Sequence, residues 1–432
     1  MNTLLQQVRV IDPVSQTDQI ADVLFTENQI QIIDHGNNFD HIPANTKKID
    51  RSGCILAPGL IDLYSHNSQP GFEERETILS LMQAAKAGGF RSIMLLPNTL
   101  PAVDQPGAVS YLQELVKQAE IDIISPPNIY FWAALTEHLQ GEKMTQLAEL
   151  ADSPIIGFTD SQSINSLPLT RRILEYLQPL QKPIALAISD RTLTGKGVMR
   201  EGYQSLRAGL PGVPSMAETS ILAALLELVE YIGTPVHIMR VSTARSVELI
   251  ADAKRRGVPI TASTTWMHLL LNSQSISENP IAIPYDPNLR LNPPLPNPAD
   301  QVALIAAVKS GVIDAIAIDH SPYTYEEKTV AFADAPAGAI GLELALPLLW
   351  QNLVTTGQLT ALELWRSLTS SPVECLGLSM NAIANLSASE LILFNPATSW
   401  QVTPQNLCCR SVNTPWLGQI LQGKVLELFS ED

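Results

Sequence analysis

The segment Leu60-Ile61-Asp62-Leu63-Tyr64-Ser65-His66 decides the fold, because it is the first of eight short β-branched or apolar runs. Longer segments with helical periodicity separate these runs, which is the pattern of repeated βα units. The eight predicted strands are Leu60–His66, Ser92–Pro97, Ile129–Leu135, Ile155–Asp160, Ile184–Ser189, Val236–Ser242, Ile260–Thr265 and Ala315–His320. Eight such units predict an α/β protein with a closed (β/α)8 barrel of the TIM type.

The two ends of the chain have a different pattern. Short apolar runs joined by polar turns predict strands at Val8–Ile11, Val23–Thr26, Gln29–Ile33, Glu390–Phe394 and Val425–Phe429. We therefore predict a small β-sandwich domain formed from both chain termini. The expected boundaries place residues 1–56 and 366–432 in this domain and residues 57–365 in the barrel.

The charge balance excludes several classes of partner. The 432 residues include 27 basic and 43 acidic side chains, which gives a net charge of -16. Nucleic acids and anionic membranes bind clustered Lys and Arg, so we expect neither as a partner. The first residues do not have the basic and apolar regions of an export signal, and no run approaches the roughly 18 apolar residues of a membrane span. The four cysteines have no C-x-x-C spacing. We therefore expect a cytoplasmic protein.

Tyr64 and His66 end the first predicted strand and, being two residues apart, face the same side of it. Functional side chains of such barrels lie at the strand ends, so a metal site would begin with this pair. The segment 57–71 reads Ala-Pro-Gly-Leu-Ile-Asp-Leu-Tyr-Ser-His-Asn-Ser-Gln-Pro-Gly. It resembles the dihydroorotase family, whose motif here is H-x-H-x-R-x-P-G. Tyr64 stands at the first histidine of that motif and Ser68 at its arginine.

Further matches to the dihydroorotases follow in order along nearly the whole chain. They are Pro97-Asn98-Thr99-x-Pro101, Gly157-Phe158-Thr159-Asp160, Arg240-Val241-Ser242-Thr243, Asn292-Pro293-Pro294-Leu295, Asp319-His320-Ser321-Pro322, Gly338 to Glu343 and Asn413 to Gly418. The family combines the predicted barrel with a β domain from both ends. The resemblance implies a two-metal hydrolase scaffold, in which histidines and aspartates hold a metal-activated water that attacks a ring amide.

The resemblance also assigns the metal positions one by one. Three of them keep a possible ligand: His66, Asp160 and Asp319. Three others no longer carry the family's histidine: Tyr64, Ala187 and Arg240. Alanine offers no lone pair and guanidinium is a permanent cation, so we expect no bound metal and no cofactor. Zinc is expected only if the chain is an active hydrolase. Asp319, the proton-handling aspartate of the family, then becomes a relic catalytic residue.

The expected substrate pocket is altered as well. Its candidate residues are Asn98, Ser68 and Arg240, of which only Asn98 matches the family. Ser68 replaces the arginine that pairs with the substrate carboxylate. Without a metal, buried carboxylates would suffer from desolvation and repulsion, so we predict that Arg240 bridges Asp160, Asp319 or both.

The remaining histidines are expected to have structural roles. His66 is interpreted as a hydrogen-bonded core residue, and His237 as a packing residue or a helix contact. His268 is interpreted as structural, and Asp319-His320 as a polar plug at the barrel mouth.

Three functions remain open at this point. The first is a non-catalytic dihydroorotase-like protein of de novo pyrimidine synthesis, a structural partner of the aspartate transcarbamoylase catalytic chain and a homo-oligomer. The second is an active zinc-dependent cyclic-amide hydrolase, either dihydroorotase or a hydantoinase or allantoinase relative, with a reduced metal site. The third is a binder of a pyrimidine intermediate, with Asn98 and Arg240 gripping a carboxylate.

Overall fold

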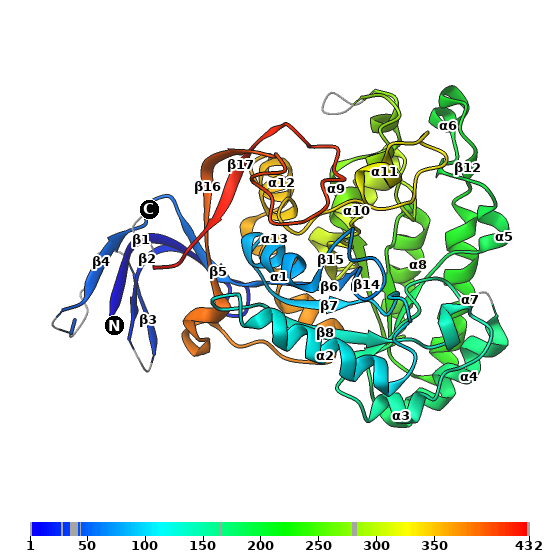
Figure 1. Ribbon diagram of the computed structural model, residues 1–432, viewed down its shortest axis with the longest axis horizontal. Helices are drawn as coiled ribbons and strands as arrows, with labels where there is room; N and C mark the ends of the chain where they lie inside the picture. The colour runs from blue at the N-terminus through cyan, green and yellow to red at the C-terminus, as the bar shows by residue number, and fades with distance from the viewer. Residues whose placement is uncertain are drawn as a thin grey trace.

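All eight predicted barrel strands are present. The computed structural model describes residues 2–26, 29–34, 42–43, 45–164, 166–278 and 283–429. The barrel strands are β6 (Leu60–Ser65), β7 (Phe90–Leu95), β8 (Asn128–Ala133), β9 (Gly157–Phe158), β10 (Ala185–Ala187), β13 (Val236–Met239), β14 (Ile260–Thr265) and β15 (Ala315–Ala317). They are parallel and lie inside a layer of helices (Figure 1). The predicted fold class is therefore confirmed.

The strands close into a ring through two seams. Hydrogen bonding orders them as β6-β7-β8-β9 and β10-β13-β14-β15. A parallel bridge between Phe158 and Ile184 joins the first group to the second. At the other seam, the backbone N–H of His66 donates to the carbonyl of His320 at 2.8 Å, and that of Asp319 donates to the carbonyl of Tyr64 at 3.1 Å. These bonds bring the ends of β6 and β15 together, which is where the predicted site residues lie.

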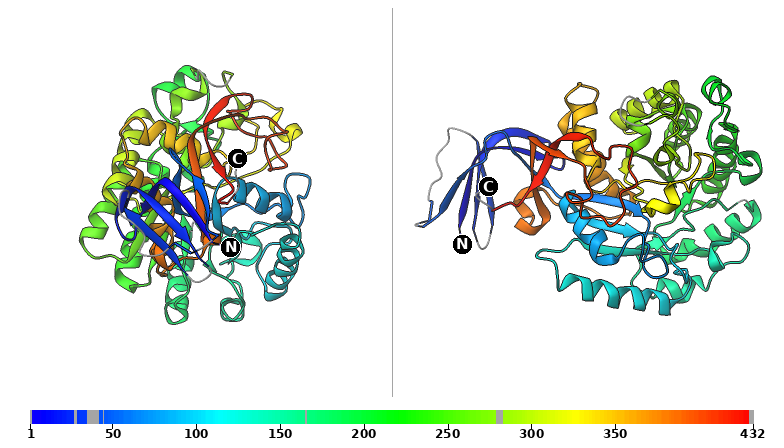
Figure 2. Two further views of the ribbon diagram at one scale, coloured as in Figure 1. Left: turned by 90° about the vertical axis from the view of Figure 1, so that its left-hand side faces the viewer. Right: turned by 45° about the horizontal axis from the view of Figure 1, so that its top comes forward.

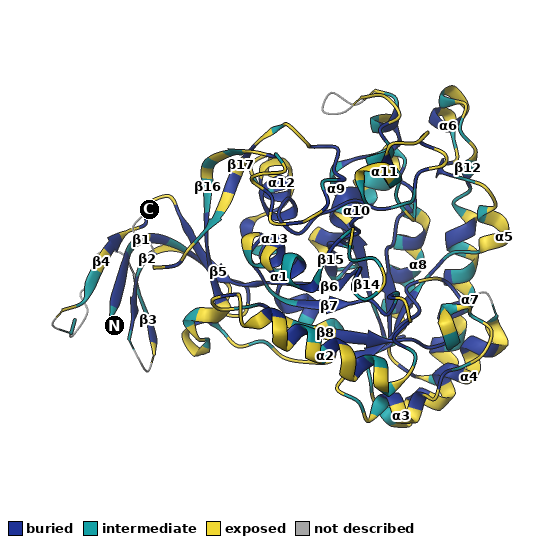
Figure 3. Cartoon of the chain, viewed as in Figure 1, coloured by how far each residue is buried: buried dark blue, intermediate teal, exposed yellow. Residues whose placement is uncertain are grey.

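The helices cover the outside of the barrel. They are α1 (Ile78–Ala87), α2 (Pro106–Glu120), α3 (Leu147–Ala151), α4 (Leu167–Leu177), α5 (Arg191–Thr194), α6 (Tyr203–Ala208), α7 (Met216–Ile232), α8 (Ala244–Arg255), α9 (Trp266–Leu270), α10 (Pro298–Ser310), α11 (Tyr325–Lys328), α12 (Ala345–Leu349), α13 (Ala361–Leu368) and α14 (Ser370–Cys375). Helix α4 shows why such segments form: Ser166 caps its N-terminus, and Leu169, Ile173 and Leu177 bury one face. Figure 3 shows the same contrast, with dark blue strands inside helices that expose one side.

An excursion interrupts the regular βα alternation after β10. Two short parallel strands, β11 (Met199–Arg200) and β12 (Gly212–Val213), flank α6 and form a two-stranded sheet of their own. The segment from β11 to β12 was not predicted from the sequence, because its two strands are only two residues long. Its buried Arg200 anchors it to the barrel by donating a hydrogen bond to Ser242 at 2.5 Å.

The β domain is built from both ends of the chain, as predicted. Its strands are β1 (Thr3–Asp12), β2 (Thr17–Phe25), β3 (Ile30–Asp34), β4 (Lys47–Asp50), β5 (Ile55–Pro58), β16 (Leu391–Gln401) and β17 (Ile420–Leu426). They form one hydrogen-bonded sheet in the order β17-β16-β5-β1-β2-β3, with β4 beside β1. Leu56 of β5 pairs with Leu393 of β16, and both belong to a hydrophobic core separate from that of the barrel. The right-hand view in Figure 2 shows this sheet beside the barrel.

No helix in the described part of the chain is long and apolar enough to cross a membrane.

Candidate functional site

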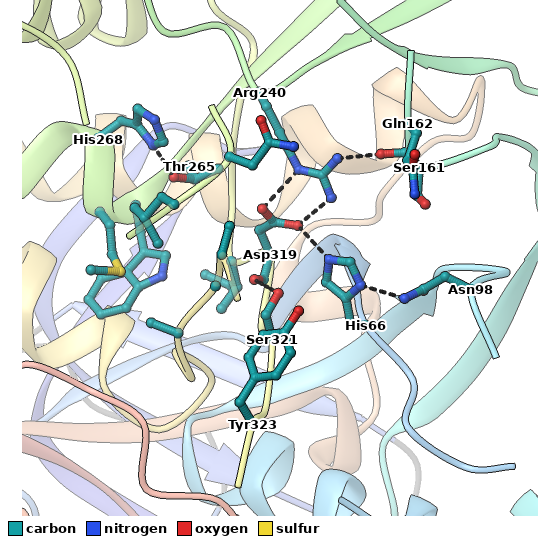
Figure 4. Close-up of a pocket in the computed structure, with 18 residues that line it drawn as sticks. His66, Asn98, Ser161, Gln162, Arg240, Thr265, His268, Asp319, Ser321 and Tyr323 are labelled. Atoms are coloured by element: carbon teal, nitrogen blue, oxygen red, sulfur yellow. Dashed lines mark hydrogen bonds and ion pairs between the residues drawn. The ribbon is translucent and has the colours of Figure 1, made fainter. Parts of the chain in front are cut away.

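The predicted site residues gather at the carboxyl ends of the barrel strands. His66 follows β6, Arg240 follows β13, and Asp319 lies two residues after β15. Together with Asn98 and Tyr323 they line a cavity of about 350 Å³ (Figure 4). Because parallel strands of a barrel end at the same rim, residues far apart in sequence meet here.

Arg240 and Asp319 form a bidentate ion pair at the centre of this cavity. The Arg240 Nε donates to Asp319 Oδ2 at 2.8 Å, and Nη2 donates to Oδ1 (Figure 4). Arg240 Nη1 donates to the carbonyl of Ser161, also at 2.8 Å. Arg240 is only 7% exposed, so its charge is balanced by protein groups rather than by water. The predicted contact between Arg240 and a carboxylate is therefore present, with Asp319 as the carboxylate.

This pairing controls the charge of Asp319. Burial by itself would raise the pKa of Asp319, but the Arg240 charge and the hydrogen bonds from His66 and Arg240 outweigh burial and hold the pKa below its usual range. Asp319 is therefore an anion, and both of its oxygens already accept hydrogen bonds from Arg240.

His66 extends the network from Asp319 to Asn98. Its Nε2 lies 3.6 Å from Asp319 Oδ1, and its Nδ1 lies 2.7 Å from the Asn98 side-chain nitrogen. An amide N–H donates, so His66 Nδ1 accepts from Asn98 while Nε2 faces Asp319. His66 thus has the structural, hydrogen-bonded role expected for it, within the pocket rather than away from it.

Tyr64 lies directly beneath Arg240. Its hydroxyl is 2.8 Å from Ser263 Oγ and accepts the backbone N–H of Arg240 at 3.1 Å. The Arg240 guanidinium carbon lies 5.1 Å from the centre of the Tyr64 ring, a cation–π arrangement. Burial raises the pKa of the Tyr64 phenol above its usual range, so the side chain remains neutral and does not supply an anionic ligand.

Asp160 is turned away from the other two retained positions. Its carboxylate accepts the backbone N–H groups of Leu135 and Thr136, at 2.8 and 2.9 Å, and the Thr136 hydroxyl. Burial raises the pKa of Asp160. Within the described residues, Arg240 forms hydrogen bonds with Asp319 and Ser161 and none with Asp160, so the predicted bridge reaches Asp319 and not Asp160. Asp160 stabilises the loop after β8 instead.

The remaining predicted residues line neighbouring cavities. Ala187 lies beside Arg240 in a second cavity of about 310 Å³. Ser68 is buried, and lines a third cavity that shares His66 and Asn98 with the first. The structure therefore brings His66, Asn98, Arg240 and Asp319 into direct contact and places Tyr64 below them. Ser68 and Ala187 line cavities next to that group, and Asp160 forms its hydrogen bonds with Leu135 and Thr136 instead.

These residues do not fit the two-metal centre of the dihydroorotases. Within the described ranges, one group of three or more His, Cys, Asp or Glu has its ligand atoms within 4.8 Å of one another, and it does not contain His66, Asp160 or Asp319. A divalent cation beside Asp319 would also meet the Arg240 guanidinium, which already occupies both carboxylate oxygens.

That group is Glu76, His320 and Cys409, a buried cluster that the sequence analysis missed. Cys409 Sγ donates to Glu76 Oε2 at 2.6 Å, and His320 Nε2 lies 3.7 Å from the same oxygen. His320 Nδ1 accepts the backbone N–H of Gly341 at 3.1 Å, so its proton is on Nε2. A metal-bound histidine needs a lone pair on that nitrogen and a proton on the other one. The cluster is therefore held together by hydrogen bonds, and the polar plug interpreted for Asp319-His320 stays a prediction.

Two further histidines are structural, as expected. His237 bonds to Thr261 at 2.9 Å and to Ser263 at 2.8 Å, and burial lowers its pKa to about 3. His268 bonds to Thr265 and to the carbonyl of Pro293, and burial lowers its pKa to about 4. Both rings are therefore neutral at physiological pH.

The fold defines a TIM-type barrel with a small β domain formed from both chain ends. Among solved structures, L-hydantoinase (dihydropyrimidinase) from Arthrobacter aurescens superposes with a TM-score of 0.80 over 98% of this chain and 93% of its own, at 18% identity. Dihydropyrimidinase from Brevibacillus agri superposes with a TM-score of 0.77 at 18% identity, over 100% of this chain and 94% of its own. At these identities the likeness shows the fold alone.

Sequence comparison narrows the class. Residues 53–246 match the dihydro-orotase-like family model. A probable dihydroorotase-like protein of Synechocystis sp. is 42% identical over 97% of this chain and 98% of its own length. A dihydroorotase of Pelobacter propionicus is 35% identical over 98% of this chain and 96% of its own. The chain belongs to the dihydroorotase-like family of pyrimidine metabolism.

Proposed function

We propose that this chain is a non-catalytic member of the dihydroorotase-like family that acts as a structural partner of the aspartate transcarbamoylase catalytic chain. The observation that supports a non-catalytic role is the bidentate ion pair between Arg240 and Asp319. Arg240 supplies positive charge where the family places metal, and Asp319 is held as its counter-ion. A carboxylate bound in this way is a poor proton acceptor, because its pKa is lowered and both of its oxygens are engaged.

The partner is proposed from the family's place in pyrimidine metabolism, and the scaffold role from the contrast between an intact fold and an altered site. In this role the chain is cytoplasmic and homo-oligomeric, and it binds neither nucleic acid nor membrane.

Two experiments test the two halves separately. Elemental analysis of protein purified without chelator, with a dihydroorotase assay before and after zinc addition, tests catalysis. We expect far less than one zinc per chain and no turnover. Co-expression with the transcarbamoylase catalytic chain tests the partner: we expect co-elution in size-exclusion chromatography and a higher melting temperature for the transcarbamoylase. Bound zinc together with turnover would refute the proposal that the chain is non-catalytic. Independent elution of the two proteins would refute the proposed partnership with the transcarbamoylase.

An active zinc-dependent cyclic-amide hydrolase remains the first alternative, because relatives named dihydroorotase are 35% identical to this chain. The residues described above do not assemble its ligand set. It is favoured over the main proposal only if zinc binding displaces Arg240 from Asp319.

Binding of a pyrimidine intermediate is the second alternative. It is supported by the cavity of about 350 Å³ and by Asn98, whose side-chain oxygen is buried without a hydrogen-bond partner. Calorimetric titration with dihydroorotate and carbamoyl aspartate tests it.

A further inference from the structure

A second cavity lies on the other side of Arg240, next to Ala187. At this position the family carries histidine, whereas alanine ends at Cβ and leaves space beside the Arg240 side chain. The cavity has a volume of about 310 Å³, at the lower limit for sites that bind small molecules. Its lining residues are Ser161, Gln162, Ser163, Ala187, Ile188, Ser189, Arg191, Thr194, Gly195, Met239, Arg240, Asn292 and Pro293.

The lining is cationic. Arg191 and Arg240 both face this cavity, and no Asp or Glu of the described residues lines it. The Arg240 charge is balanced by Asp319, which lies on the side of the first cavity. Arg191 Nη2 donates to the neutral side chain of Gln162 at 2.6 Å. Arg191 also interacts electrostatically with the Asp160 carboxylate, which does not line this cavity. The side chains that line the cavity therefore include two cations and no anion, in a chain whose net charge is -16.

The polar groups of the lining are suited to an anion. A guanidinium has five N–H donors, and Arg240 uses three of them on Asp319 and Ser161. Arg191 uses one in its contact with Gln162. Hydroxyl groups of Ser189 and Thr194, 3.1 Å apart, add donors at the same wall. Arginine pairs recognise planar or tetrahedral oxyanions through several parallel N–H bonds.

We infer that the cavity between Arg191 and Arg240 binds a small oxyanion, the carboxylate of a small organic acid or a phosphate group. The site adjoins the cavity around Asp319, with which it shares Ser161, Gln162, Arg240 and Asn292. Ala187 distinguishes it, since Ala187 lines neither that cavity nor the third one, which Arg191 also lines. The inference rests on the proposed function, since Arg240 offers its free N–H groups only when no metal stands in its place.

Isothermal titration calorimetry of the full chain tests the site, with sodium phosphate and sodium succinate as probes at constant ionic strength. We expect saturable binding of at least one probe, and the tighter probe identifies the ligand as phosphate or carboxylate. Arg191→Gln removes one of the two cations that line the cavity and should weaken binding about tenfold or more. Arg171→Gln is the matched control, since Arg171 is exposed and pairs with Glu175 on α4; its affinity should equal that of the unaltered chain.

A second variant tests whether the probe occupies the cavity itself, without changing the charge of its lining. Ala187→Leu keeps both arginines but fills the cavity, and should also abolish binding, with circular dichroism confirming that the barrel is folded. Absence of saturable binding in metal-free protein, or equal affinity in Arg191→Gln and the unaltered chain, overturns the inference. Zinc analysis of the same samples distinguishes the proposed function from the proposed oxyanion site. Bound zinc contradicts the proposed function, whereas metal-free protein that binds neither phosphate nor succinate contradicts only the oxyanion site.

Discussion

The hydroxyl of Tyr64 accepts the backbone N–H of Arg240 at 3.1 Å, so two side chains at former histidine positions of the family contact each other. The Arg240 guanidinium also lies over the Tyr64 ring, with 5.1 Å between its central carbon and the ring centre. Arg240 has a positive φ of 55°, a backbone conformation that is costly for a side chain of this size. Tyr64 therefore supports the strained backbone from which the ion pair to Asp319 is made.

Replacing Arg240 should destabilise the fold. Arg240→Ala leaves the buried Asp319 carboxylate without its main counter-charge, which typically costs about 3 kcal/mol or more of unfolding free energy. Urea unfolding monitored by circular dichroism measures this loss. Arg171→Ala, on the exposed face of α4, is the control and should change stability by less than about 1 kcal/mol. Equal midpoints for the two variants would mean that the ion pair contributes no stability.

The Tyr64 hydroxyl should contribute separately from the ring. Tyr64→Phe keeps the cation–π contact but leaves the Arg240 N–H without its acceptor, at a cost of about 1–3 kcal/mol. Tyr203→Phe, at a side chain that is 75% exposed, is the matched control and should be neutral. A neutral Tyr64→Phe variant would show that water or another group replaces the hydroxyl.

Stability should depend on the ionisation of Asp319 at acidic pH. Its pKa is lowered in the folded chain, so the folded state favours the charged carboxylate. This contribution is fully present above the unfolded-state pKa of about 3.9 and disappears as the pH falls through the lower folded-state pKa. The stability difference between the unaltered chain and Asp319→Asn should therefore be constant above about pH 5 and shrink below pH 4. Urea titrations at several pH values measure it, and a difference independent of pH down to pH 2 would contradict the assignment.

Restoring the histidines should restore metal binding. The triple variant Tyr64→His, Ala187→His, Arg240→His removes the guanidinium and returns three nitrogen ligands beside His66 and Asp319. We expect about one zinc or more per chain by elemental analysis, against far less in the unaltered chain. Adding Asp319→Ala to the triple variant should reduce the zinc again. A triple variant that folds but binds no zinc would show that the turned carboxylate of Asp160 also prevents assembly.

Much of the fold was predictable because apolar strands of a parallel barrel are continuous in sequence. Strand β14, for example, is Ile260–Thr265 both in the prediction and in the structure. Strand β4, Lys47–Asp50, was not predicted, because its polar residues carry no apolar run and it forms only by pairing with β1. The excursion around α6 was missed for a similar reason, since strands of two residues have no periodicity.

The ion pair at the centre of the site was predictable, because a single substitution, Arg240 at a histidine position of the family, requires a carboxylate partner. A permanent cation at Arg240 predicts a carboxylate partner, and Asp319 is that partner. The direction of Asp160 was not predictable, because it depends on Leu135 and Thr136 in another loop. Glu76, His320 and Cys409 come from three segments that are far apart in the sequence. No local sequence pattern therefore predicts that they form a cluster.

The pairing of β5 with β16 has a consequence for synthesis on the ribosome. Leu56 and its neighbours on β5 are made early, but their partners around Leu393 emerge only after the whole barrel has been translated. Until then one edge of β5 is open to pairing with other chains, the kind of exposed edge that promotes aggregation. A nascent chain stalled before β16 should therefore depend on chaperones, even with all eight barrel strands already outside the exit tunnel.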